Sequence, residues 1–180
     1  MTDAQQFEVF LLNYQNMVFS TAMRLLAHQS DAEDITQEVF LRAYERFADL
    51  SDSPTAGGWL KTVATNLSLN HITRYRARWS FFSELFTGSE TDEDIEARFP
   101  AQADPDALLA ADRRELVDHA LRQLPPSQRV PLVLYHLDGL RYEEIAEKLG
   151  VSLGKVKTDL FRGREALRRI LRLQLGDDEL

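Results

Sequence analysis

The sequence contains no cysteine among its 180 residues. This excludes disulfide bonds and thiolate metal sites, and it fits a reducing compartment. No apolar stretch approaches the roughly 20 residues that a helix needs to span a bilayer. The N-terminus also lacks the basic segment and apolar run of a secretory signal. We therefore expect a cytoplasmic protein with no membrane span of its own.

Patterns typical of β-strands are nearly absent as well. Val130–Leu137 is apolar enough for a strand, but it lies in a helical context and is predicted to be helix. Elsewhere apolar residues recur every three or four positions, which predicts an all-α fold. The expected helices are 7–25, Asp31–Phe47 with Asp31 as N-cap, Gly58–Trp79, Ala107–Leu124, Ser127–Leu137, Tyr142–Leu149 and Leu153–Leu173. The turn-rich segment Leu50–Gly58 is predicted to be a loop.

Charge is distributed unevenly along the chain. The formal net charge is −8, and the window Phe81–Asp112 alone holds nine acidic residues and one basic residue. This composition predicts an extended acidic linker. The expected organisation is two small helical domains, 1–79 and 107–180, joined by a linker over 80–106.

Basic residues gather in two of the predicted helices. Trp59–Trp79 carries four basic residues and no acid, and Val151–Leu173 carries seven basic residues against two acids. Clustered positive charge on a helix is typical of phosphate binding. A solvated face with a favourable helix dipole is the simpler alternative for one such helix. Two of them in an acidic chain favour nucleic-acid binding.

The segment Tyr142–Leu167 has the pattern of a helix-turn-helix. Gly150 stands where the chain must turn between two helices, and Ser152 can cap the second helix. An apolar stripe along that helix would anchor it, while the opposite side presents Lys155, Thr158, Arg162 and Arg169. A recognition helix in the major groove requires this arrangement. An ordinary helical hairpin is the alternative.

These motifs resemble a known family. "LPPSQRVPLVLYHLDGLRYEEIAEKLGVSLGKVKTDLFRGREAL" resembles region 4 of bacterial sigma factors. "DAEDITQEVFLRAYERF" and "GGWLKTVATNLSLNHITRYR" resemble region 2. With only these two regions, over about residues 5–79 and 107–173, the chain resembles the extracytoplasmic-function (ECF) group of the sigma-70 family.

The resemblance implies a promoter-specificity factor with four kinds of contact. Its partners would be core RNA polymerase, through the β′ coiled coil and the β flap, promoter DNA, and an anti-sigma factor. The β′ coiled coil would be contacted by Asp34, Gln37, Glu38, Leu41 and Arg42. The −10 element would be bound by Lys61, Asn66, Asn70, Arg74, Arg76 and Arg78, with a flipped base near the loop 51–57. The −35 element would be read by Ser152, Lys155, Lys157, Thr158, Asp159, Arg162 and Arg164.

Three positions depart from the family pattern in the recognition helix. Lys155 stands where threonine is usual, Asp159 where arginine is usual, and Gly163 where alanine is usual. Asp159 would repel phosphate, accept from a cytosine amino group, or pair with Lys155. Asp159→Arg is therefore expected to strengthen DNA binding and to shift −35 preference. Gly163 is expected to cost about 1 kcal/mol against alanine unless close packing requires it.

Two other functions compete with this interpretation. A stand-alone helix-turn-helix regulator would leave residues 5–79 unexplained. A metal-dependent hydrolase could use Asp31, Glu33, Asp34 and Glu38 with His28, but no metal-binding motif or nucleophile–base pair supports it. We therefore expect no catalytic residue, no metal and no cofactor. The acidic linker is a candidate internal inhibitor of one of the basic helices.

Overall fold

The computed structural model describes residues 3–85 and 110–175, and their side chains except at 75–85 and 110–112. All regular elements in these ranges are helices, as the apolar spacing predicts. They are α1 (Asp3–Leu26), α2 (Gln29–Glu45), α3 (Phe47–Leu50), α4 (Ala56–Leu85), α5 (Ala110–Arg122), α6 (Pro126–His136), α7 (Tyr142–Leu149) and α8 (Leu153–Leu175). Most of the expected acidic linker lies outside the described residues.

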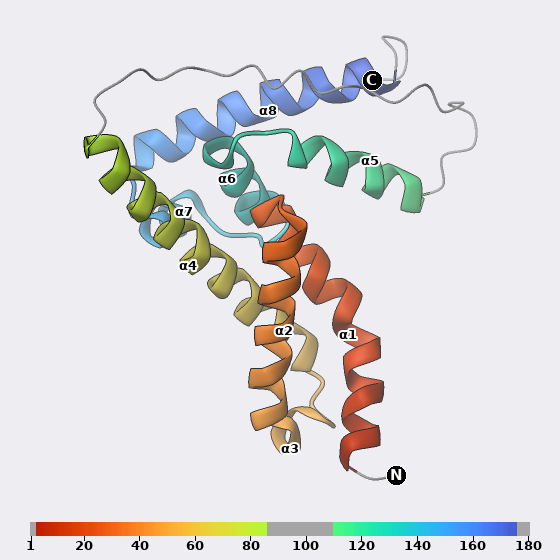
Figure 1. Ribbon diagram of the computed structural model, residues 1–180. Coiled ribbons are helices and arrows are strands. Elements are labelled where there is room, and N and C mark those ends of the chain that lie inside the picture. The colour runs from red at the N-terminus through yellow and green to blue at the C-terminus, as the bar shows by residue number, and fades with distance from the viewer. Residues whose placement is uncertain (1–2, 86–109, 176–180) are drawn as a thin grey trace.

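The N-terminal half is a bundle of α1, α2 and α4 (Figure 1). Its core includes the fully buried side chains of Val18, Val39 and Leu60, together with the buried rings of Phe10 and Phe40. At the open end of the bundle, the rings of Phe7, Tyr44 and Phe47 pack edge to face. Aromatic edge contacts of this kind add stability beyond the burial of their area.

Several boundaries in this half differ from the sequence prediction, and α1 begins at Asp3, four residues before the expected start. The predicted N-cap of the second helix, Asp31, is wrong, because α2 begins two residues earlier. His28 is the N-cap, and its Nδ1 accepts a hydrogen bond from the Asp31 backbone N–H at 3.4 Å. The loop before α4 is shorter than predicted, because α4 begins at Ala56. At its other end α4 continues to Leu85, into the segment where the linker was expected. Gly57 lies inside this helix. The ring of Tyr14 would lie 3.2 Å from a Cβ added there, so the close packing favours glycine.

The C-terminal half is built around α6, whose apolar residues are buried by α7 and α8. Proline begins this helix, which is favourable because the first helical N–H groups have no partner. The segment Val130–His136 is helix, as predicted, and Leu137 is the C-cap of α6. The bounds of α7 agree with the sequence prediction, and Gly150 at its end has a φ of +63°. This left-handed conformation is open to glycine and supports the predicted sharp turn.

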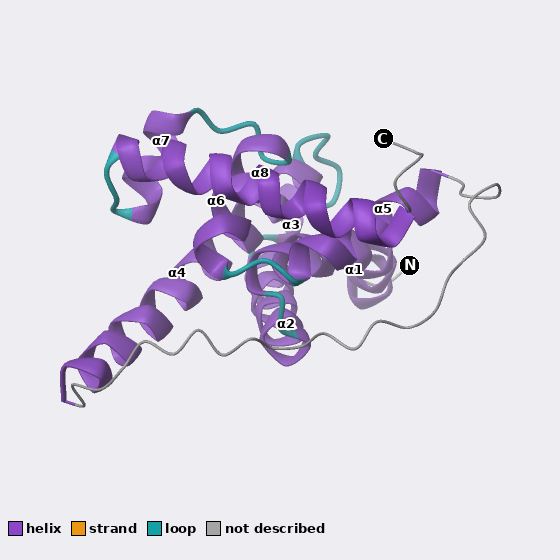
Figure 2. Ribbon diagram, turned by 90° about the horizontal axis from the view of Figure 1, so that it is seen from above, coloured by secondary structure: helices purple, strands orange, loops and turns teal. Residues whose placement is uncertain are grey.

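The two halves pack against each other, which the sequence analysis did not predict. Leu25 of α1 is fully buried and Leu69 of α4 is 7% exposed, both within the apolar core of the C-terminal half. In Figure 1 the end of α1 and the middle of α4 lie against α6 and α7. The C-terminal end of α4 projects away from the other helices (Figure 2).

Candidate nucleic-acid interface

The helix-turn-helix presents one face of α8 to solvent. Ser152 caps the helix as predicted, its Oγ accepting from the Lys155 N–H at 3.2 Å. Val156 and Leu160 are buried against α6 and hold the helix in place. The opposite face is exposed and carries Lys157, Thr158 and Arg162, together with Arg169 about two turns after Arg162. This arrangement supplies cations and a hydroxyl to DNA while the apolar stripe stays covered.

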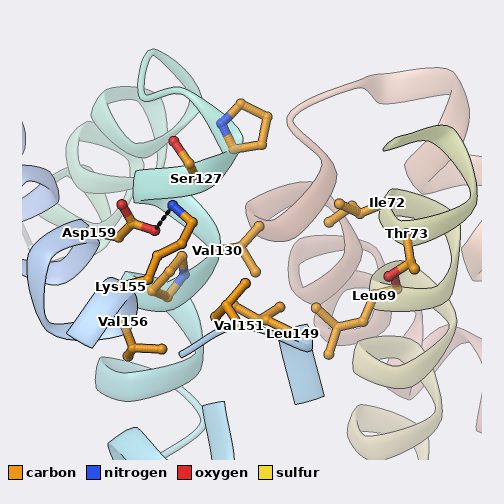
Figure 3. Close-up of a pocket in the computed structure, with 12 residues that line it drawn as sticks. Leu69, Ile72, Thr73, Ser127, Val130, Leu149, Val151, Lys155, Val156 and Asp159 are labelled. Atoms are coloured by element: carbon orange, nitrogen blue, oxygen red, sulfur yellow. Dashed lines mark hydrogen bonds and ion pairs between the residues drawn. The ribbon is translucent and has the colours of Figure 1, made fainter. Parts of the chain in front are cut away.

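Asp159 lies on the side of α8 that faces α6. It is 8% exposed, and its Oδ2 is 2.8 Å from the Nζ of Lys155 (Figure 3). The predicted pairing with Lys155 at i, i+4 is confirmed. The side chain lines the same small cleft as Ser127 at the start of α6. Its place among the −35 contacts remains a prediction; in this structure the residue restrains Lys155 from the protein side.

Arg164 is also engaged within the protein. Its Nε donates to His136 Nε2 at 3.4 Å, and its guanidinium lies 5.3 Å from the centre of the Tyr135 ring. Burial, and secondly the charge of Arg164, lower the pKa of His136. A neutral imidazole is what an accepting Nε2 requires. Arg164 thus ties α8 to α6, in contrast to the exposed cations of the same helix.

The candidate −10 residues on α4 divide into two groups. Lys61 and Asn66 contact the C-terminal half, through Asp138 and Lys148 respectively. Asn70 and Arg74 are exposed. The side chains of Arg76 and Arg78 lie outside the described residues. Trp59 packs partly buried against the core of the N-terminal bundle, which agrees with a structural role for its ring.

The loop before α4 is a tight turn. The hydroxyls of Ser53 and Thr55 lie 2.9 Å apart, and the Thr55 N–H donates to Ser53 Oγ. Neighbouring residues of this turn are exposed, so its polar groups can reach a ligand. The binding of a flipped base at this loop remains a prediction.

The residues expected to contact the polymerase lie on α2. Asp34, Gln37, Leu41 and Arg42 are exposed, and Glu38 is held by Arg42 through a 2.9 Å ion pair. Leu41 is 58% exposed and offers apolar area to a partner. It lines an apolar groove of about 400 Å³ between α1 and α2, with Phe7, Leu11, Gln15, Phe19, Glu33, Thr36, Gln37, Phe40 and Tyr44. No sequence motif indicates this groove, although Phe7, Leu11 and Phe19 share one face of α1.

A second apolar groove, of about 430 Å³, lies on the C-terminal half. It is lined by Val117, Leu121, Leu132, Val133, His136, Leu137, Arg164, Leu167, Arg168 and Leu171. By contrast, the cleft between the halves beside Lys155 and Asp159 has a volume of about 30 Å³. That is room for about one water molecule, so this cleft is no small-molecule site.

Two classes of site are not found in the described part of the chain. No group of three or more histidine, aspartate or glutamate side chains there could hold a metal ion. None of its helices combines the length and apolar character needed to cross a membrane.

Comparison with known proteins agrees with this architecture. The family models for sigma-70 region 2 and sigma-70 region 4 match residues 10–78 and 114–167. The ECF RNA polymerase sigma factor SigE of Mycolicibacterium smegmatis is 36% identical over 159 residues, which are 88% of this chain and 58% of that protein. The ECF RNA polymerase sigma factor SigW of Bacillus subtilis is 30% identical over 159 residues, 88% of this chain and 85% of that protein. The ECF RNA polymerase sigma-E factor of Escherichia coli is 28% identical over 92% of this chain and 86% of its own length.

Among solved structures, the sigma factor RpoE of Bartonella quintana, in complex with the anti-sigma factor NepR, is 24% identical. The comparison covers 93% of this chain and 97% of that chain, with a TM-score of 0.48, a similarity too low to bear on function. The matches to both sigma-70 regions and to SigW decide the relationship. They also account for the N-terminal half, which a stand-alone regulator leaves unexplained. The chain belongs to the extracytoplasmic-function group of the sigma-70 family, whose members are transcription initiation factors and not enzymes.

Proposed function

We propose that this protein binds core RNA polymerase and directs initiation at promoters through their −35 and −10 elements. The observation that carries the proposal is the recognition helix. Its apolar stripe is buried against α6, while Lys157, Thr158 and Arg162 face solvent. Cations and hydroxyls of this kind contact phosphates and the edges of guanine and other bases in the major groove. Ser152 and Lys155 lie at the start of the same helix and complete the −35 surface.

The −10 element is assigned to α4. Asn70 and Arg74 are exposed on it, and the basic residues Arg76 and Arg78 follow in sequence. Lys61 and Asn66 belong to this surface once the C-terminal half is moved away. A melted strand needs a cationic track and polar groups along one helix, and α4 offers both.

The polymerase is assigned to α2 and the groove beside it. The exposed leucine and the charged residues Asp34 and Arg42 form a mixed surface suited to a helical partner such as the β′ coiled coil. The groove on the C-terminal half is a second apolar surface, suited to the β flap. An anti-sigma factor that covers these surfaces would silence the protein. Since RNA polymerase is cytoplasmic, we place the activity in the cytoplasm.

Reconstitution tests the proposal. Core polymerase mixed with this protein should open and transcribe its promoters, identified by mapping transcripts after overproduction. Arg162→Ala is expected to reduce transcription without weakening the complex with core polymerase. Leu41→Ala is expected to weaken that complex. A protein that binds duplex DNA tightly yet forms no complex with core polymerase would instead be a stand-alone regulator.

A further inference from the structure

The turn between α6 and α7 places a carboxylate against the candidate −10 surface of α4. Asp138 in this turn has a side chain only 11% exposed, and both of its oxygens are in use. Oδ1 lies 3.0 Å from Lys61 Nζ, and Oδ2 accepts from Thr65 Oγ1 at 3.2 Å. Lys61 Nζ also donates to the Leu137 carbonyl at 2.9 Å. One anionic group thus satisfies a lysine and a threonine that lie one turn apart on α4.

A DNA backbone phosphate would present the same chemistry to these two residues. It offers two anionic oxygens, and lysine ammonium groups and threonine hydroxyls are frequent phosphate ligands. Thr65 was not among the residues expected from the sequence, and it is buried beneath this turn. The lysine and the threonine therefore form a site for an anionic group, and a side chain of the same protein fills it.

The neighbouring contacts cover the same stretch of α4. Lys148 of α7 donates to Asn66 Oδ1 at 3.3 Å, and Leu69 is buried in the core of the C-terminal half. Asn70 and Arg74 remain exposed, as do Lys157 and Arg162 on the recognition helix. This closed arrangement covers part of the −10 surface and leaves the −35 surface open.

In the closed arrangement α4 and α8 share one apolar core, so the two candidate surfaces lie too close together to bind both promoter elements at once. Their names place them about 25 base pairs apart, which is roughly 85 Å along duplex DNA at about 3.4 Å per base pair. The contacts between Asp138 and α4 are direct hydrogen bonds, so they must break before both elements are bound.

We propose that Asp138 acts as an internal phosphate mimic, occupying in the free protein a site for a −10 strand phosphate formed by Lys61 and Thr65. The inference rests on the proposed function of α4 as the −10 surface. Docking of α8 on the −35 duplex would remain possible in the closed protein. Binding of the melted strand would require Asp138 to leave, which couples −10 binding to separation of the two halves.

The test compares two variants with the same change of charge. Asp138→Asn removes the competing charge, whereas Glu147→Gln neutralises an exposed acid on α7 of the same half. The probe is a short fluorescein-labelled DNA single strand of mixed sequence, bound by the free full-length protein and followed by anisotropy. The affinity of Asp138→Asn for this strand is expected to be about five times that of Glu147→Gln. It should also steepen the log–log salt dependence by about 0.7, because Lys61 now releases a counterion when it binds phosphate.

Removal of Lys61 tests whether the gain in strand affinity comes from the release of this lysine. In a Lys61→Ala background, Asp138→Asn should add no more affinity than Glu147→Gln does. Equal effects of the two acid variants in the otherwise native protein would overturn the proposal, as would a gain that persists without Lys61. Thermal unfolding of each variant shows whether the fold is retained, and Asp138→Glu, which keeps the charge, should stay near the native affinity.

Failure of the proposed function would look different. If Lys61→Ala left both strand binding and promoter opening by the holoenzyme unchanged, the assignment of α4 to the −10 element would be wrong. If Lys61→Ala reduced both but Asp138→Asn had no specific effect, α4 would keep its role and only the internal mimic would be rejected.

Discussion

Gly163 shows how one residue fixes the approach of α8 to α6. A Cβ added there would lie 2.9 Å from Leu132 Cδ1 and 3.1 Å from the Gln128 carbonyl oxygen. The side chain could shift, but the backbone oxygen cannot easily move within a helix. Close packing therefore requires glycine at this position, where alanine is usual in the family.

We predict that Gly163→Ala destabilises the protein by about 1–2 kcal/mol, because overpacking outweighs the gain in helix propensity. The measurement is urea unfolding followed by circular dichroism. Gly154→Ala is the matched control on the same helix, since no atom lies within 4 Å of its added Cβ. It should stabilise by up to about 1 kcal/mol. Equal stabilisation by both variants would show that the contact at Gly163 carries no cost.

Asp159 acts at the same scale through its neighbour. We predict that Asp159→Asn releases Lys155 and raises affinity for duplex DNA about threefold, while the lost ion pair costs only about 0.5 kcal/mol of stability. Anisotropy with a labelled duplex measures the first effect and urea unfolding the second. In a Lys155→Met background the affinity gain should shrink to the part due to general charge. An equal gain in DNA affinity without Lys155 would contradict the idea that Asp159 restrains this lysine.

At the scale of elements, the start of α7 depends on a charged cap. Glu144 Oε2 accepts from the Arg141 backbone N–H at 2.8 Å. This hydrogen bond, followed by that from the Arg141 side chain, lowers the pKa of Glu144. A carboxyl whose pKa is lowered in the folded state stabilises the fold above its unfolded pKa of about 4.3, and that contribution is lost as pH falls through the folded pKa.

We therefore predict that Glu144→Gln is less stable than the native protein at neutral pH and that the two converge in acid. Urea midpoints of both proteins between neutral pH and about pH 3 provide the measurement. Glu143→Gln, an exposed acid in the same turn but outside the capping box, should show a smaller difference. A difference for Glu144→Gln that stays constant with pH would show that its charge plays no part.

The elements also show what the sequence could and could not predict. The helix-turn-helix was predicted closely because its signals are local: Gly150 permits the turn and Ser152 caps the next helix. The start of α4 was missed because Gly57 and Gly58 suggest a loop, whereas packing against Tyr14 favours glycine within the helix. The partners of Lys61 were not predictable, because Asp138 lies far away in sequence and no periodicity connects them.

At the scale of the whole molecule, the closed arrangement depends on polar contacts as well as on shared apolar core. Arg24 of α1 forms a two-point ion pair with Asp118 of α5, at 2.7 and 3.1 Å. Arg129 of α6 is 4% exposed and donates to the carbonyls of Leu25 and Leu26 at the end of α1. The guanidinium thus caps a helix of the other half, where the helix dipole favours a cation.

Substitution of Arg129 tests how firmly the two halves are joined. Burial lowers its pKa to about 10, so the group stays charged at neutral pH and supplies three donors, the third to the Leu124 carbonyl at 2.6 Å. We predict that Arg129→Ala lowers the free energy of unfolding by about 2–3 kcal/mol, because buried carbonyls lose a charged donor. Because a base with a lowered folded pKa changes stability with pH only above that pKa, which is about 10 for Arg129, this loss should be the same at pH 6 and pH 8. Arg122→Ala, at an exposed arginine of α5, should stay within about 0.5 kcal/mol of the native protein. A matching small effect of Arg129→Ala would mean that these hydrogen bonds contribute little to the packing of α1 against α6.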